Sequence, residues 1–283
     1  MDCIEFIEHF IETPPRRNIK DRLNPFENFT EEQFRERFRF RKDSVLQLLG
    51  MISSDLEHGT NRNHCIPPIL QLVTTLRFYA AGHFQRTDGD LIGIDQSSAC
   101  RVIHRVTRAI ATRHEQFIRF PSNQDLNNVK FHFKNIAQFP GVLGAIDCSH
   151  IPIKRPSGDN GELYRNRKGY FSINVQAVTD ANMCFTNIVC RWPGSTHDCR
   201  IFDNSSLSYK FENNLLDGFL LGDGGYACRK YMMTPILNPA TQKEQNYNKS
   251  HIATRIVVER MFGVWKQRFQ CLRIPLRTSL DQR

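Results

Sequence analysis

The sequence lacks the long apolar run that a membrane-spanning helix requires. No stretch of its 283 residues approaches the roughly 20 consecutive apolar residues that cross a bilayer. The first residues, Met1 to Glu8, are acidic where a secretory signal peptide would be basic. We therefore expect neither a membrane protein nor a secreted one.

Paired cysteine motifs are also missing. None of the nine cysteines follows another with the two-residue spacing typical of a structural zinc site. We expect free thiols in a reducing compartment. Acidic residues are outnumbered, since 38 Lys and Arg face 29 Asp and Glu for a net charge of +9. That excess permits a polyanionic partner such as nucleic acid but does not by itself indicate one.

The amino-terminal half shows helical periodicity. Thr30 is typical of a helix N-cap, and the apolar residues after it predict two helices broken around residues 41–43. Pro67 and Pro68 open a further helix, which is expected to end near Gly82. This half of the chain is therefore predicted to be α-helical.

Two short helices are predicted next. The first covers residues 87–94, and the second begins after Asp95, which is suited to cap it. A tight turn at Gly93 joins them. This arrangement matches the outline of a helix-turn-helix.

Beyond residue 138 the periodicity changes from helical to extended. Three strands, a helix, a short buried strand and a final helix are predicted in that order. We expect these elements at residues 141–153, 170–179, 184–192, 197–211, 218–226 and 251–269. A three-stranded meander followed by α/β alternation is the outline of an RNase H-like mixed sheet.

The predicted fold is therefore α/β, with an α-helical domain before the sheet. We expect an amino-terminal helical arm over residues 1–66 and a helical region resembling a helix-turn-helix over 67–138. The RNase H-like catalytic domain is expected over residues 139–283.

Four acidic residues stand where strands and helices should bring them together. Asp147 and Asp223 each follow a buried apolar run, Asp198 opens the helix after the third strand, and Glu259 lies on the last helix. Ligands of open α/β sheets bind at the carboxyl ends of the strands. Converging carboxylates repel one another unless a cation is present, which predicts a divalent metal such as Mg²⁺ or Mn²⁺.

Glu259 shares a helical stripe with Ile252, Ile256 and Gly263, a spacing that normally faces a core. A carboxylate in such a stripe is unfavourable unless something pairs with it. Each acid also has a local interpretation. Asp147 and Asp223 suit turns and Asp198 suits a helix cap, while Glu259 is placed to pair with Arg255, four residues earlier.

Five motifs resemble those of the Harbinger transposase-derived nucleases, which are relatives of the PIF/Harbinger DDE transposases. The resemblance covers nearly the whole chain, and the motifs occur in the family's order. They are Gly144–Ile151, Asn166–Gln176, Gly194–Phe202, Leu221–Tyr226 and Val258–Gly263. Family members usually continue further past the last motif, so we expect a shortened carboxyl end here.

The resemblance implies an RNase H-like domain, a divalent metal cofactor and a nuclease reaction on DNA. The acidic positions of the family correspond to Asp147, Asp198, Asp223 and Glu259. Asp147, Asp223 and Glu259 would form the catalytic triad and bind metal, with Asp198 as an additional metal ligand or a supporting acid. The family further implies a Myb/SANT-like DNA-binding partner that assists nuclear import, and hence a location in nucleus and cytoplasm.

Two basic clusters are candidates for DNA contact. Arg101, Arg105 and Arg108 fall on one face of a predicted helix whose amino end would meet base edges. A second cluster follows the first catalytic strand and comprises Lys154, Arg155, Arg165, Arg167 and Lys168. The alternative for both clusters is a solvated basic surface without a DNA role.

Three functions follow from these features. The first is a metal-dependent nuclease that hydrolyses phosphodiester bonds in DNA. The second is a catalytically inactive DNA-binding regulator that keeps the transposase fold. The third is an interaction protein whose helical amino-terminal half recruits a partner.

Overall fold

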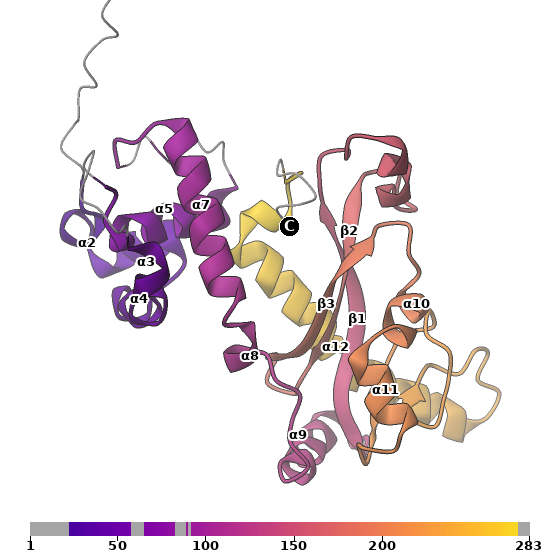
Figure 1. The fold of residues 1–283 in the computed structure, drawn as a ribbon. Helices are drawn as coiled ribbons and strands as arrows, with labels where there is room; N and C mark the ends of the chain where they lie inside the picture. The colour runs from indigo at the N-terminus through magenta and orange to yellow at the C-terminus, as the bar shows by residue number, and fades with distance from the viewer. Residues whose placement is uncertain (1–22, 58–64, 83–88, 90–91, 277–283) are drawn as a thin grey trace, which may run out of the picture.

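The computed structural model describes residues 23–57, 65–82, 89 and 92–276. Figure 1 shows helices α2 to α5 grouped on one side of the molecule and the strands on the other. Within the described part, no helix is both long and apolar enough to cross a membrane.

The amino-terminal helices pack around one apolar core. Phe34, Phe38, Ile52, Leu72 and Val106 are buried there and come from four different helices. The helices of this part are α2 (Pro25–Asn28), α3 (Glu31–Phe38), α4 (Lys42–Leu56), α5 (Pro68–Ala81), α7 (Gln96–Ala111) and α8 (His114–Phe117).

The local signals predicted for these helices are confirmed. Thr30 caps α3 through a capping box with Gln33, and the helical conformation is interrupted between Phe38 and Lys42. α5 ends at Gly82, whose φ of 65° is the left-handed conformation that glycine adopts readily. Asp95 caps α7 by accepting a hydrogen bond from Ser98 N. The first helix of the predicted helix-turn-helix falls largely outside the described residues, so that motif stays a prediction.

The sheet is mixed, as predicted. Its five strands lie in the order β3-β2-β1-β4-β5. β1 pairs antiparallel with β2, and β2 with β3, whereas β1–β4 and β4–β5 are parallel. The strands are β1 (Val142–Pro152), β2 (Ser172–Thr179), β3 (Phe185–Pro193), β4 (Phe219–Leu221) and β5 (Met232–Met233).

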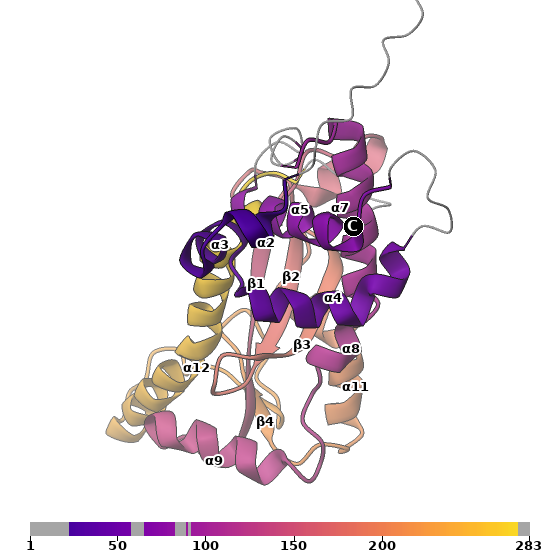
Figure 2. The ribbon, with the colours of Figure 1, turned by 90° about the vertical axis from the view of Figure 1, so that its left-hand side faces the viewer.

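Helices cover both faces of this sheet. Figure 2 shows α12 on one side of the central strands and α11 on the other. Alternate residues of β1 divide between the two cores, so that Ile146 packs with Phe202 and Phe211, and Ala145 packs with Val258. The helices of this part are α9 (Leu126–Ala137), α10 (Asp198–Asp203), α11 (Ser206–Glu212) and α12 (Gln242–Arg268), with short 3₁₀ helices at Asp159–Tyr164 and Gln270–Leu272.

Three predicted elements need correction. The helix expected over residues 197–211 is two helices, because Ser205 accepts a hydrogen bond from Ser208 N and starts α11 anew. The final helix begins at Gln242 rather than at residue 251, since Thr241 and Glu244 form a capping box. β4 covers only Phe219–Leu221, and the two-residue β5 was not predicted.

The two parts of the molecule meet at the end of α12. Arg268 Nη2 donates a hydrogen bond of 2.6 Å to Arg39 O, and the rings of Phe40 and Phe269 lie 6.0 Å apart. α9, which belongs to the predicted helical region 67–138, packs against β1 and α12. The domain boundaries stay predictions.

The packing of α9 gives a test of the fold. Phe133 is fully buried against the sheet, whereas Phe131 on the same helix is 60% exposed. Phe133→Ala should lower the free energy of unfolding by about 3–5 kcal/mol, because it leaves a cavity under α9. Phe131→Ala, the matched control, should change it by no more than about 0.5 kcal/mol. Urea denaturation checks both, and equal effects of the two substitutions would contradict the packing.

Candidate active site

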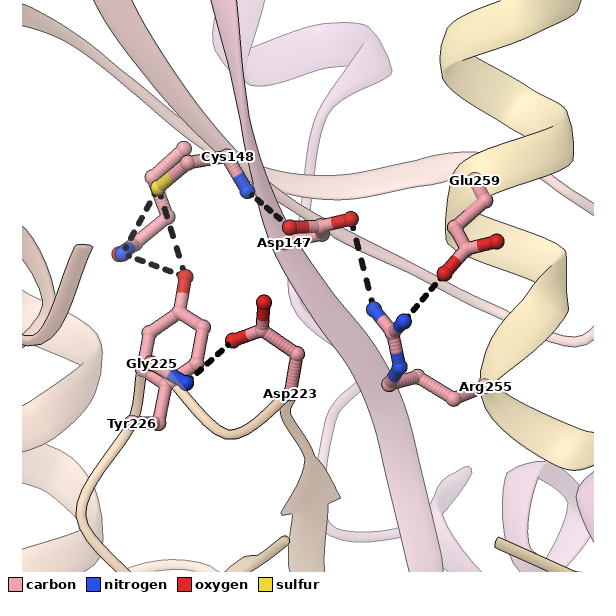
Figure 3. Close-up of polar contacts among 8 residues, drawn as sticks. Asp147, Cys148, Asp223, Gly225, Tyr226, Arg255 and Glu259 are labelled. Carbon is pink, nitrogen blue, oxygen red and sulfur yellow. Dashed lines mark hydrogen bonds and ion pairs between the residues drawn. The ribbon is translucent and has the colours of Figure 1, made fainter. Parts of the chain in front are cut away.

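The register of the parallel strands β1 and β4 determines the relative position of the first two acids, Asp147 and Asp223. Ala145 of β1 lies opposite Leu221 of β4. Asp147 and Asp223 each come two residues further along, so both carboxylates emerge at the same place on the sheet. Figure 3 shows the two side chains facing each other, with Cys148 N donating to Asp147 Oδ1 at 2.7 Å and Gly225 N donating to Asp223 Oδ1 at 2.9 Å.

Asp198 lies at the start of α10. Asn174 Nδ2 donates to Asp198 Oδ1 and to Thr196 O, each at 2.9 Å. A Cβ built on Gly225 would lie 3.1 Å from Asp223 Oδ1 and 3.9 Å from Asp198 Oδ2. The two carboxylates therefore border the same small space, and a side chain at position 225 would intrude on it.

The charges of the other two aspartates affect the pKa of Asp147. Its pKa is raised to about 6, mainly by burial and also by the negative charges of Asp223 and Asp198. The Cys148 N–H and the positive charge of Arg255 act in the opposite direction. Asp147 is therefore a largely buried carboxylate that is most stable as an anion when positive charge is close.

Glu259 reaches the site from α12, but not in the way its sequence pattern predicted. The stripe of Ile252, Ile256, Glu259 and Gly263 does not face the core, because Ile252 is 57% exposed and the Glu259 side chain 50% exposed. The buried face of α12 is instead formed by His251, Thr254, Val257, Val258 and Phe262. Two polar members of this face bond to backbone carbonyls, His251 through Nε2 to Met233 O and Thr254 to Ser250 O, whereas buried His251 Nδ1 has no hydrogen-bond partner.

Arg255 connects Glu259 to Asp147. Its Nη2 donates to Glu259 Oε1, and its Nη1 lies 3.4 Å from Asp147 Oδ2. The local alternative for Glu259, pairing with Arg255 on its own helix, is therefore present, and the same guanidinium also meets Asp147.

A buried polar network behind the acids was not predicted. Gln176 Nε2 donates to Tyr226 OH and to the Asp198 backbone oxygen, each at 3.1 Å, and Cys148 Sγ lies 3.4 Å from Tyr226 OH. Burial raises the pKa of both Cys148 and Tyr226, so both stay protonated. The available signal was the alternation of Asn174 and Gln176 within an otherwise apolar strand.

The donor set suits a hard divalent cation, because it consists of carboxylate oxygens from a strand, two helices and a loop. Asp147 is influenced by the charges of Asp198 and Asp223, and Glu259 is linked to it through Arg255. In the positions that the described side chains take, no three Asp, Glu, His or Cys are close enough to hold a metal ion together. Binding would require the carboxylates to move.

The first basic cluster lies on α7. Arg101 and Arg108 are exposed, whereas Arg105 is half-buried and its Nη1 donates to Gln71 Oε1 at 3.4 Å. A DNA-contacting role for these three residues stays a prediction.

The second basic cluster is divided by Glu162. Glu162 pairs with Arg155 at 3.2 Å and with Arg165 at 2.8 Å, so its one negative charge is shared between two of the five cations. Lys154, Arg167 and Lys168 are exposed. The pKa of His150 is lowered by burial and also by the charges of Lys266, Arg167 and Lys168, while Asp198 raises it. These cations therefore flank the strand that carries Asp147.

Comparison with known proteins defines the class. The family model of the DDE superfamily endonucleases matches residues 146–283, which contain all four acids. The chain is 37% identical to the proposed nuclease HARBI1 of Homo sapiens over 248 residues, covering 87% of this chain and 71% of that protein. HARBI1 of Rattus norvegicus is 36% identical with the same coverage.

A plant relative is more distant. The Arabidopsis thaliana protein named Antagonist of like heterochromatin protein 1 is 25% identical over 215 residues, covering 69% of this chain and 54% of its own length. No solved structure matches the chain. The chain belongs to the Harbinger transposase-derived nuclease family, which confirms the resemblance found in its motifs.

The anchoring of Asp198 can be tested by substitution. Asn174→Ala removes the two donors that hold Thr196 O and Asp198 Oδ1, so it should lower the free energy of unfolding by about 1–3 kcal/mol. Asn182→Ala, in the exposed β2–β3 turn, should change it by less than about 0.5 kcal/mol. Chemical denaturation of both variants measures the difference. A destabilisation no larger in Asn174→Ala than in the control would show that Asn174 does not anchor the site.

Proposed function

We propose that this protein is a divalent-metal-dependent endonuclease that acts on DNA. The observation that carries the proposal is the register of β1 and β4, which sets Asp147 beside Asp223 with Asp198 on their flank. Packing three like charges around a partly buried position is unfavourable unless a cation is part of the working site. Family membership supports the nuclease class.

Each acid has a distinct proposed role. Asp147, whose side chain is largely buried, would hold the cations together with Asp223 and Glu259. Asp198 serves as an additional ligand or supports Asp223. Bound Mg²⁺ or Mn²⁺ ions supply an activated water and offset the charge of the scissile phosphate. The protein positions the carboxylates through the Cys148 and Gly225 backbone N–H groups and through Asn174.

A hollow beside the second basic cluster supports a nucleic-acid substrate. It encloses about 1030 Å³ and is lined by Ile153, Lys154, Tyr170, Phe171 and Arg273, among others. Pro152, at its edge, lies roughly 17 Å along β1 from Asp147, at about 3.3 Å per residue. Cationic and aromatic side chains at this distance suit the phosphates and bases flanking a cleavage site.

Removing single acids tests the catalytic roles. Asp147→Asn and Glu259→Gln keep the shape of each side chain and remove its charge, so Mg²⁺- or Mn²⁺-dependent cleavage of plasmid DNA should fall at least about a hundredfold. Asp217→Asn is the matched control, because Asp217 is 93% exposed and pairs with Lys130 away from the other acids. Cleavage that persists in Asp147→Asn or Glu259→Gln would remove that residue from the mechanism.

The basic cluster makes a second prediction. Arg167→Ala and Lys168→Ala should weaken DNA binding and reduce the slope of log affinity against log salt concentration by about 0.9 for each phosphate that is no longer neutralised. Arg165→Ala should have a smaller effect, because Glu162 already offsets its charge. Fluorescence anisotropy with labelled duplex DNA at several salt concentrations measures these slopes. Unchanged slopes in Arg167→Ala and Lys168→Ala would place the DNA elsewhere, with the arginines of α7 as the next candidates.

A second function is a DNA-binding regulator without catalytic turnover. Arg255 favours it, because this guanidinium pairs with Asp147 and Glu259, the carboxylates that a metal ion would need. The plant relative's name also describes an antagonist of another protein rather than a nuclease. DNA binding by the purified protein with no cleavage in either Mg²⁺ or Mn²⁺ would favour the regulator over the nuclease.

A Myb/SANT-like DNA-binding protein is the proposed partner, and the nucleus and cytoplasm are the proposed location. The support is family membership, since a nuclease that acts on chromosomal DNA has to enter the nucleus. Co-purification of such a partner at low salt, together with nuclear staining that depends on it, would support both.

A further inference from the structure

The positively charged side chain of Arg255 lies among the acids of the site. Figure 3 shows the Arg255 guanidinium between the carboxylates of Asp147 and Glu259. It contacts one oxygen of each, and its side chain is 15% exposed, compared with 19% for Asp147 and 50% for Glu259. Arg255 is thus as buried as the central acid of the site, unlike a typical surface ion pair.

Arg255 contacts carboxylate oxygens of Asp147 and Glu259 that a metal ion would need as ligands. Asp147 Oδ2 faces Arg255 Nη1, and Asp147 Oδ1 already accepts from Cys148 N. Both oxygens of the central carboxylate are therefore engaged by donors. A divalent ion between Asp147 and Glu259 would stand within a few ångströms of the guanidinium charge and would be repelled by it.

Two opposing effects of Arg255 on metal affinity can be compared. It holds Glu259 toward the site, but an ion pair between residues four apart on a helix is worth only about a factor of two. Its repulsion of a doubly charged ion a few ångströms away corresponds to more than about tenfold, even when screened by water. The repulsion is the larger effect, so Arg255 should weaken metal binding overall.

We propose that Arg255 is an internal counter-ion, which holds Asp147 and Glu259 together in the metal-free protein and leaves Asp147 when a divalent cation binds. The inference rests on the proposed metal-dependent function and adds a means of setting the metal affinity of that site. Arg255 is a positioning residue on this account, because it acts through the two carboxylates rather than on DNA.

The experiment measures Mn²⁺ binding and stability in the full chain, without DNA. Free Mn²⁺ is followed by electron paramagnetic resonance at pH 7.5, and thermal unfolding is recorded in EDTA and in Mn²⁺. Arg255→Met removes the charge at similar length, whereas Arg255→Lys keeps the charge but has no planar fork to span two carboxylates. Arg260→Met is the matched control, because it removes one charge from an exposed position of the same helix.

Arg255→Met should bind Mn²⁺ on the order of tenfold more tightly than the wild type. It should unfold at a lower temperature in EDTA and recover more of that difference on adding Mn²⁺. Arg255→Lys should fall between the two, and it carries the test if Arg255→Met does not fold. Arg260→Met should stay within about twofold of the wild type.

The outcomes separate this inference from the proposed function. Equal or weaker Mn²⁺ binding by both Arg255 variants, beside a wild type that binds, would overturn the counter-ion and leave the metal site standing. If the wild type binds no Mn²⁺ and Arg255→Met does, the result would support the inference and show that Arg255 excludes the metal. Absence of binding in every variant would overturn the inference together with the metal-dependent function.

Discussion

The parallel pairing of β1 with β4 is the constraint on which the site depends. With Ala145 opposite Leu221, Asp147 and Asp223 are brought side by side, and the repulsion between them cannot be relieved by moving either strand. The surrounding residues accommodate this charge. Backbone N–H groups of Cys148 and Gly225 bind one oxygen of each carboxylate, and Asn174 holds Asp198 nearby. The raised pKa of Asp147 records the remaining electrostatic cost of placing an anion there.

The helix that crosses the sheet supplies the compensating charge. α12 carries both Glu259, which adds a fourth carboxylate, and Arg255, which neutralises part of the set. One guanidinium thus offsets part of the negative charge of the site, and a more highly charged ion has to compete with it. The same geometry therefore relates both candidate functions. A nuclease requires that the guanidinium yield to metal, whereas a DNA-binding regulator would retain it.

Much of the fold could be predicted from the sequence because its signals are local. The caps at Thr30 and Asp95, the helix end at Gly82 and the first three predicted strands all appear in the structure. The errors arose where tertiary contacts decide. The two-residue β5 is defined only by its pairing with β4. The sequence predicts the start of α12 at its apolar stretch, whereas the helix begins earlier, at its capping box. The predicted stripe through Glu259 is wrong because His251 and Thr254, which are polar, lie on the buried face of the helix and bond to the backbone carbonyls of Met233 and Ser250.

Asp147 and Asp223 could be predicted as site residues from the sequence, because each follows a buried apolar run. Only the register of β1 and β4 shows that they lie side by side. Arg255 was visible as a helical partner of Glu259, and its contact with Asp147 depends on how α12 lies over the sheet. We propose that the four acids surround cations, and anomalous diffraction from crystals soaked in Mn²⁺ can show whether they do. We expect anomalous peaks bounded by Asp147 together with Asp223 or Glu259. Well-diffracting soaked crystals with no peak at Asp147 would rule out this metal site.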